Sequence, residues 1–147
     1  MDNVFTDAEF MTAKEKAAVL KDWERLLKAM ATGDFGSTEE TECGRKSSKF
    51  TKRLYNHLHL HCGHIAHYNQ SGFFYAQFGD SEKIINFVET FHSHTTFCAS
   101  DYRDITRAMG QMLVDYGPKI VARCIVAERE QDITVGKALL AKHGITV

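Results

Sequence analysis

Hydrophobic side chains recur at the spacing of an α-helix in nearly every segment of the chain, whereas the alternation typical of β-strands is scarce. Between residues 19 and 30, large apolar residues fall on one helical face, and Trp23 is expected to anchor the core there. Two capping boxes precede this face, one beginning at Thr6 and the other at Thr12. The pattern therefore predicts either one long helix or a short helix followed by a second.

The same spacing predicts the remaining helices beyond residue 47. The first of them runs from about Ser48 to Asn69, and the next begins at Asp80 or Ser81. A third runs from Ser100 or Asp101 to Gly117, a fourth begins at Pro118, and the last runs from about Thr134 to His143. Gly117 is expected to end one helix and Pro118 to open the next, because glycine favours the position after a helix and proline fits the first turn.

The segment from residue 31 to residue 48 interrupts this pattern. It has three glycines, many small polar residues and no period, with an acidic half before a basic half. We expect it to be the longest loop. The sequence as a whole predicts an all-α fold, a single bundle-like domain of five or six helices over residues 1–147 with a long loop near 31–48.

Composition and charge narrow the function classes. The chain has 147 residues, 44% hydrophobic and 25% charged, which is typical of an ordinary globular domain. Its net charge of −1 provides no field that would gather nucleic acid, so nucleic acid is not an expected partner. The first residues have no basic start followed by an apolar run, so we do not expect a secretory signal, and no apolar stretch is long enough to cross a membrane. The four cysteines form no CxxC pair, so they are expected to be free thiols in a cytoplasmic protein.

Histidines are the most unusual feature, since seven of the eight lie between His57 and His94. His57, His61 and His64 are spaced i, i+4, i+7 along one edge of a helix. Imidazoles at i and i+4 can converge on one metal ion, and Glu89 with His92 on the next predicted helix are the natural further donors. Such nitrogen and oxygen ligands suit zinc, iron or nickel.

A core role is the alternative interpretation of these histidines. A histidine on an apolar helix face usually packs in the core and is satisfied by a carbonyl or hydroxyl group. His61 fits this description, because it lies near the middle of the expected buried stripe. That stripe consists of Phe50, Leu54, Leu58, His61, Ile65 and Tyr68.

An aromatic segment provides a candidate partner-binding patch. It contains Phe73, Phe74, Tyr75 and Phe78. If these rings are exposed they are expected to bind a protein partner or a second copy of the chain; otherwise they pack in the core.

The sequence has no phosphate-binding glycine loop, no GxSxG elbow and no HExxH motif. We therefore expect a non-enzymatic protein-interaction or regulatory module, which needs no cofactor. One alternative is a transition-metal-binding protein that uses His57 and His61. The second alternative is a small enzyme that uses a histidine as its base.

Overall fold

The computed structural model describes residues 5–62, 69–95 and 100–146, and for residues 92–95 it describes the backbone alone. In chain order the described elements are α1 (Ala13–Thr32), β1 (Thr38–Thr41), β2 (Gly44–Ser47), α2 (Lys52–His61), α3 (Gln70–Phe78), α4 (Ser81–Thr95), the 3-10 turn η1 (Ser100–Tyr102) and α5 (Arg103–Lys142). This part of the chain thus has five α-helices packed together and one small hairpin, which confirms the predicted helical fold.

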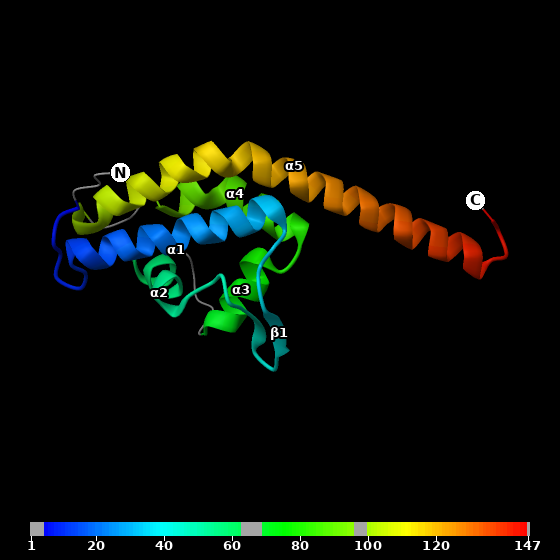
Figure 1. Ribbon diagram of the computed structural model, residues 1–147, viewed down its shortest axis with the longest axis horizontal. Coiled ribbons are helices and arrows are strands. Elements are labelled where there is room, and N and C mark those ends of the chain that lie inside the picture. The colour runs from blue at the N-terminus through cyan, green and yellow to red at the C-terminus, as the bar shows by residue number, and fades with distance from the viewer. Residues whose placement is uncertain (1–4, 63–68, 96–99, 147) are drawn as a thin grey trace.

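The longest helix, α5, runs along one side of the molecule with α1 and α4 packed against its first half (Figure 1). The helices α1 and α5 run in the same direction, because Lys16 contacts Asp104 near their starts and Met30 contacts Arg123 further along. Trp23 is fully buried between them and donates a hydrogen bond from Nε1 to the carbonyl of Met109, 3.0 Å away. Trp23 is therefore the core anchor that the helical spacing predicted.

The first two helices begin later than the sequence indicated. The second of the two capping boxes starts α1, with the Thr12 hydroxyl accepting from the amide of Glu15. The prediction of a helix at Thr6 is wrong, because residues 8 and 11 form a bridge instead. Helix α2 begins at Lys52 because the hydroxyl of Thr51 caps it, and it ends at His61 rather than continuing to residue 69. Ile65 and Tyr68 lie outside the described residues.

The expected loop between residues 31 and 48 contains the hairpin of β1 and β2, so the loop prediction is corrected. The antiparallel register places Glu39 opposite Lys46 and Glu40 opposite Arg45. Arg45 donates from Nε to the carboxylate of Glu40 at 2.8 Å. The acidic half of the segment thus pairs with its basic half across the two strands. The hairpin packs on α3, where Gly44 lies against the backbone of that helix.

The prediction that one helix ends at Gly117 and another starts at Pro118 is also wrong, since α5 continues through both residues and also includes the helix expected from Thr134. A proline inside a helix leaves the carbonyl four residues earlier without its usual partner. That residue is Val114, which is 57% exposed, so its carbonyl can reach water. Ile120 and Cys124 are fully buried just beyond the proline, and their packing offsets its cost.

Candidate functional site

The second half of α5 projects from the rest of the molecule. Cys124 is the last buried residue, and none of residues 125–142 is buried among the described residues. At 1.5 Å per residue, this projecting segment of α5, residues 125–142, extends for about 27 Å. Figure 1 shows it as an arm that leaves the body, residues 5–124, in a straight line. A helical segment of this length without a single buried residue is unusual in a globular fold.

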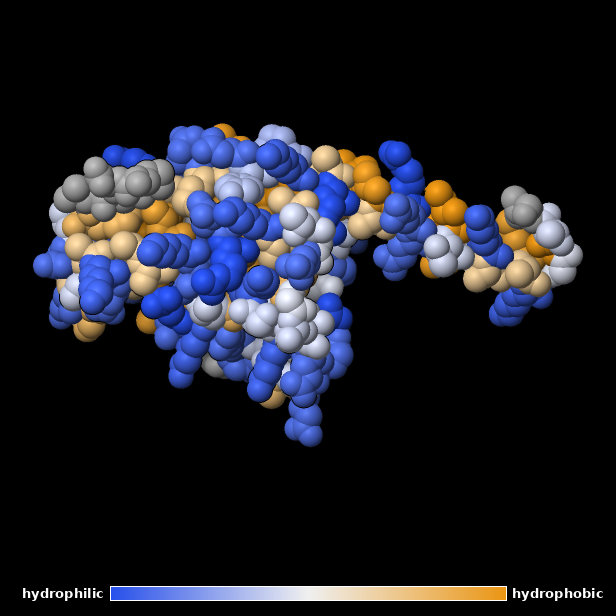
Figure 2. Space-filling view, viewed as in Figure 1, coloured by the Kyte–Doolittle hydropathy of each residue, from blue (hydrophilic) through white to orange (hydrophobic). Residues whose placement is uncertain are grey.

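The projecting segment has aliphatic side chains where a solvated helix would have polar ones. Five of its large apolar residues are 43 to 54% exposed, and they are Ile125, Val126, Ile133, Val135 and Leu139. In Figure 2 hydrophobic and charged surfaces alternate along the arm. Between residues 133 and 141 the only charged side chain is that of Lys137. Exposed aliphatic surface of this extent is typical of a site that another protein covers.

Charge is divided between the two halves of the projecting segment. Residues 125–132 contain three acids and one arginine, a net charge of −2, whereas residues 133–142 contain two lysines, a net charge of +2. A cleft lies where the acidic half leaves the body, between α5 and the start of α4. Its lining consists of Asp80, Ser81, Glu82, Ile85, Glu128, Gln131 and Asp132. Four carboxylates therefore line the base of the arm.

Arg123 fixes the point at which the arm leaves the body. Its Nε donates to the carbonyl of Met30 at 2.6 Å, near the end of α1. The last turn of a helix has carbonyls without intrahelical partners, and the guanidinium of Arg123 satisfies one of them. Its positive charge also interacts favourably with the negative end of the helix dipole. This contact holds the end of α1 against α5 directly before the exposed aliphatic residues begin.

The histidine cluster lies at the opposite end of the body. His57 is fully buried, and neither of its ring nitrogens has a hydrogen-bond partner among the described residues. Burial, together with the nearby His61 and Lys16, lowers the pKa of His57 to about 3. His61 is half-buried, its ring centroid lies 5.4 Å from that of His57, and burial lowers its pKa as well. The ring of His61 stacks on Tyr102, with 3.7 Å between the centroids.

The pair predicted from the i, i+4 spacing is therefore close in space. Of the other predicted ligands only Glu89 is described in full, and the structure does not bring it to the pair. Glu89 is exposed on α4. His64 and the side chain of His92 lie outside the description. Within the described residues, no group of three or more histidines, cysteines or acids is arranged to hold a metal ion. Of the predicted ligands, His57 and His61 are thus the two that the structure places close together.

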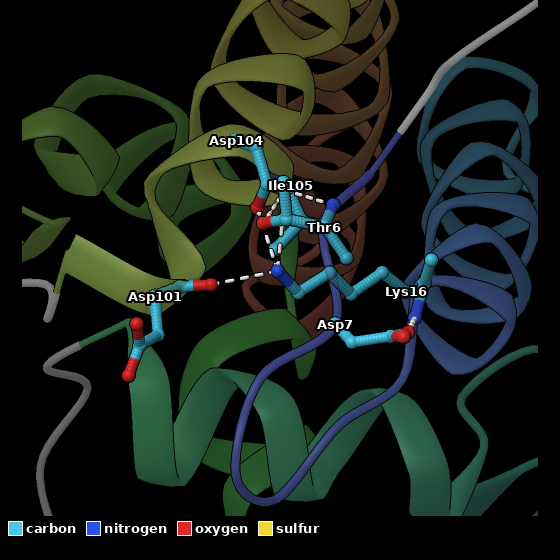
Figure 3. Close-up of polar contacts among 7 residues, drawn as sticks. Thr6, Asp7, Lys16, Asp101, Asp104 and Ile105 are labelled. Carbon is cyan, nitrogen blue, oxygen red and sulfur yellow. Dashed lines mark hydrogen bonds and ion pairs between the residues drawn. The ribbon is translucent and has the colours of Figure 1, made fainter.

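A buried ion pair lies next to these histidines, and the sequence analysis did not identify it. The ammonium group of Lys16 is fully buried, 3.0 Å from the carboxylate of Asp104, and it also donates to the carbonyl of Asp101 at 2.6 Å (Figure 3). Burial alone would raise the pKa of Asp104, but hydrogen bonds from Thr6 and Lys16 outweigh it and lower that pKa. The available signal was a lysine three residues before Val19 on the apolar face of α1.

The aromatic segment forms α3 and lies mostly in the core. Phe73, Phe74 and Phe78 are buried around Phe50. Tyr75 is 46% exposed, and the ammonium of Lys83 lies 3.9 Å from the centre of its ring. Of the four residues predicted to bind a partner, Tyr75 alone therefore presents its ring to solvent.

Comparison with protein-family models, curated proteins and solved structures gives no match for this chain. Among the described residues, no helix has both the length and the apolar character that a membrane span requires. The arguments for function therefore depend on the geometry described above.

Proposed function

We propose that this protein is a protein-interaction module, and that the projecting segment of α5 is its partner-binding element. The observation that supports this proposal is the arm itself. It leaves the body after Cys124 and exposes aliphatic side chains at its start, at residues 125 and 126, and again between residues 133 and 139. Recognition through such an element is a common mode, in which the apolar face of a helix packs into a groove or against another helix.

The energetics of the arm indicate that a partner stabilises it. Isolated helices of this length are marginal in water. Residues 133–136 read Ile-Thr-Val-Gly, which are poor helix formers that together cost about 2 to 3 kcal/mol relative to alanine. The arm therefore has little intrinsic helical stability. Full burial of one Val, Leu or Ile side chain contributes about 1.5 to 3 kcal/mol, so covering a few of them would offset that cost.

Photo-crosslinking in the expressing cell tests this function directly. A photoreactive amino acid is placed at Val135 or Leu139 on the arm, and at exposed Lys28 on α1 as the matched control. We expect a discrete crosslinked protein band from the two arm positions and none from the control. If neither arm position gives a discrete adduct, the proposal is wrong. The mass of the adduct separates a second copy of the chain from a different protein.

Metal binding through His57 and His61 is a second candidate function. One observation favours it, namely the two unpartnered nitrogens of a buried His57. The buried ammonium of Lys16 nearby opposes a bound cation, since it lowers the pKa of His57 electrostatically. Elemental analysis of tag-free protein tests this candidate. Stoichiometric metal that is lost in a His57→Ala/His61→Ala variant supports it, and substoichiometric metal in the wild type refutes it.

A further inference from the structure

We infer that the partner of the projecting segment is a second copy of this chain, and that the two arms pair antiparallel. This inference rests on the proposed function and names its partner. Three features of the described residues support it: the division of charge along the arm, the face that continues the core, and the acidic cleft at the arm's base.

The division of charge favours an antiparallel arrangement of two identical arms. Residues 125–132 have a net charge of −2 and residues 133–142 a net charge of +2. In an antiparallel pair, the acidic half of each arm lies beside the basic half of the other. In a parallel pair, like charges would lie side by side, which is destabilising. The sequence of a single arm thus provides complementary charge for a second copy of itself.

One face of the arm continues the face that the first half of α5 buries against the body. From buried Cys124, residues on this face follow at alternating three- and four-residue steps, the spacing of paired helices. They are Cys124, Glu128, Gln131, Val135, Ala138 and Lys142, and Leu139 lies at the edge of the same face. If Val135 lies on the two-fold axis, Glu128 of each copy lies opposite Lys142 of the other. Val135 then packs against its own copy at the centre, with Leu139 opposite Gln131 on either side. Each end of the pair has a contact between opposite charges.

The cleft at the base of the arm extends this complementarity to the body. Asp80 and Glu82 lie beside Glu128 and Asp132 there, and none of these four carboxylates belongs to an ion pair among the described residues. From Glu128 to Lys142 the helix spans about 21 Å, so the basic end of the second arm reaches the cleft when the arms overlap fully. The second copy therefore places Lys142 against otherwise unpaired acids.

Sedimentation equilibrium of the full chain tests self-association. The monomer has a mass of 16.7 kDa, and we expect the wild type to sediment as a species of twice this mass. Val135→Asp places two charges at the centre of the pair, and it should weaken association about a hundredfold or more. The matched control is Thr134→Asp, an exposed neighbour about 100° away around the helix. A wild-type monomer at high concentration, or equal effects of the two variants, overturns the inference.

A charge exchange tests the antiparallel register. Glu128→Lys and Lys142→Glu should each weaken the dimer about tenfold, because each creates two like-charge contacts per dimer. The double variant restores the wild-type pairing, and an equimolar mixture of the two single variants forms a mixed dimer. The register is refuted if the dimer of the double variant is weakened by as much as the two single substitutions weaken it together.

The crosslinking and sedimentation results together distinguish the two proposals. If the wild type is monomeric and the arm crosslinks to a different protein, the interaction function stands and self-pairing is wrong. If the wild type is monomeric and the arm crosslinks to nothing, both are wrong.

Discussion

Lowering the pH should unfold this protein through His57, because its imidazole is buried and neutral in the folded state. The pKa of His57 is lowered to about 3, whereas an unfolded histidine has a pKa near 6.5. Between these two values the unfolded chain binds one more proton than the folded chain. The free energy of unfolding therefore falls as the pH falls through this window, and the contribution of His57 is fully present only above about pH 6.5.

The size of this effect follows from the same two pKa values. Once the unfolded imidazole is fully protonated, each further pH unit costs about 1.4 kcal/mol of stability. Integrating from pH 7.5 to pH 5 gives a loss of about 2 kcal/mol from His57 alone. Asp22 and Asp104, whose pKa values are also lowered, act in the same direction but mainly near and below pH 4. The window between pH 5 and pH 7.5 thus isolates the histidines.

Urea unfolding at several pH values measures this loss, with His57→Leu as the test variant and His143→Leu, at the exposed end of the chain, as its control. In His57→Leu most of the pH dependence should disappear, with a smaller part remaining from His61. The stability of this variant at pH 7.5 should match or exceed that of the wild type, because the substitution removes two buried nitrogens without partners. Equal pH slopes for the wild type and His57→Leu would show that this reasoning is wrong.

Three further substitutions test the fold and the arm. Gly44→Ala should lower the stability by more than about 1 kcal/mol, because φ is +137° there and the added Cβ overlaps a carbonyl in the first turn of α3; thermal melting measures the loss. Gly136→Ala should instead stabilise the arm by about 1 kcal/mol, because alanine favours the helix and no other part of the described chain lies within 4 Å of the added Cβ. The helicity measured by circular dichroism should therefore increase. Lys16→Met should lower the stability by about 2 kcal/mol or more, because Asp104 loses the ammonium that compensates its partial burial, and a variant as stable as the wild type would contradict this role.

Helical spacing predicted the elements whose position depends on one buried face. Helices α1 and α4 occur where their apolar stripes and caps indicated, since Trp23 and Phe87 on those stripes face the same core. The hairpin was not predicted, because its four-residue strands are short and polar and lack an alternating apolar pattern. Its stability depends on contacts with α3, such as the approach of Gly44, and these are tertiary contacts without a periodic signal.

The candidate sites show the same limit. The spacing of the histidines placed His57 beside His61 but exchanged their roles, since His57 is the buried residue and His61 is partly exposed. The predicted buried stripe extends to Tyr68, whereas α2 ends at His61. The middle of the predicted stripe therefore lies too far along the chain, at His61 rather than at His57. A hydrophobic pattern also indicates which residues of the arm favour burial, but it does not indicate which part of the chain or which other molecule would bury them. The exposure of Val135 and Leu139 is therefore information that only the structure provides.

The continuity of α5 through Pro118 explains why the aliphatic side chains of the arm are exposed. A helix that ended at Gly117, as the local signals indicate, would allow residues 125–142 to turn back onto the body and bury their own aliphatic side chains. The packing of Cys124 and the hydrogen bond from Arg123 to the end of α1 instead keep the helix straight at the point where it leaves the body. Because the helix continues, residues 125–142 do not fold back onto the body. They form an arm that combines exposed aliphatic side chains with a division of charge. The proposed antiparallel second copy suits such an arm, because it would place each acidic half beside a basic half.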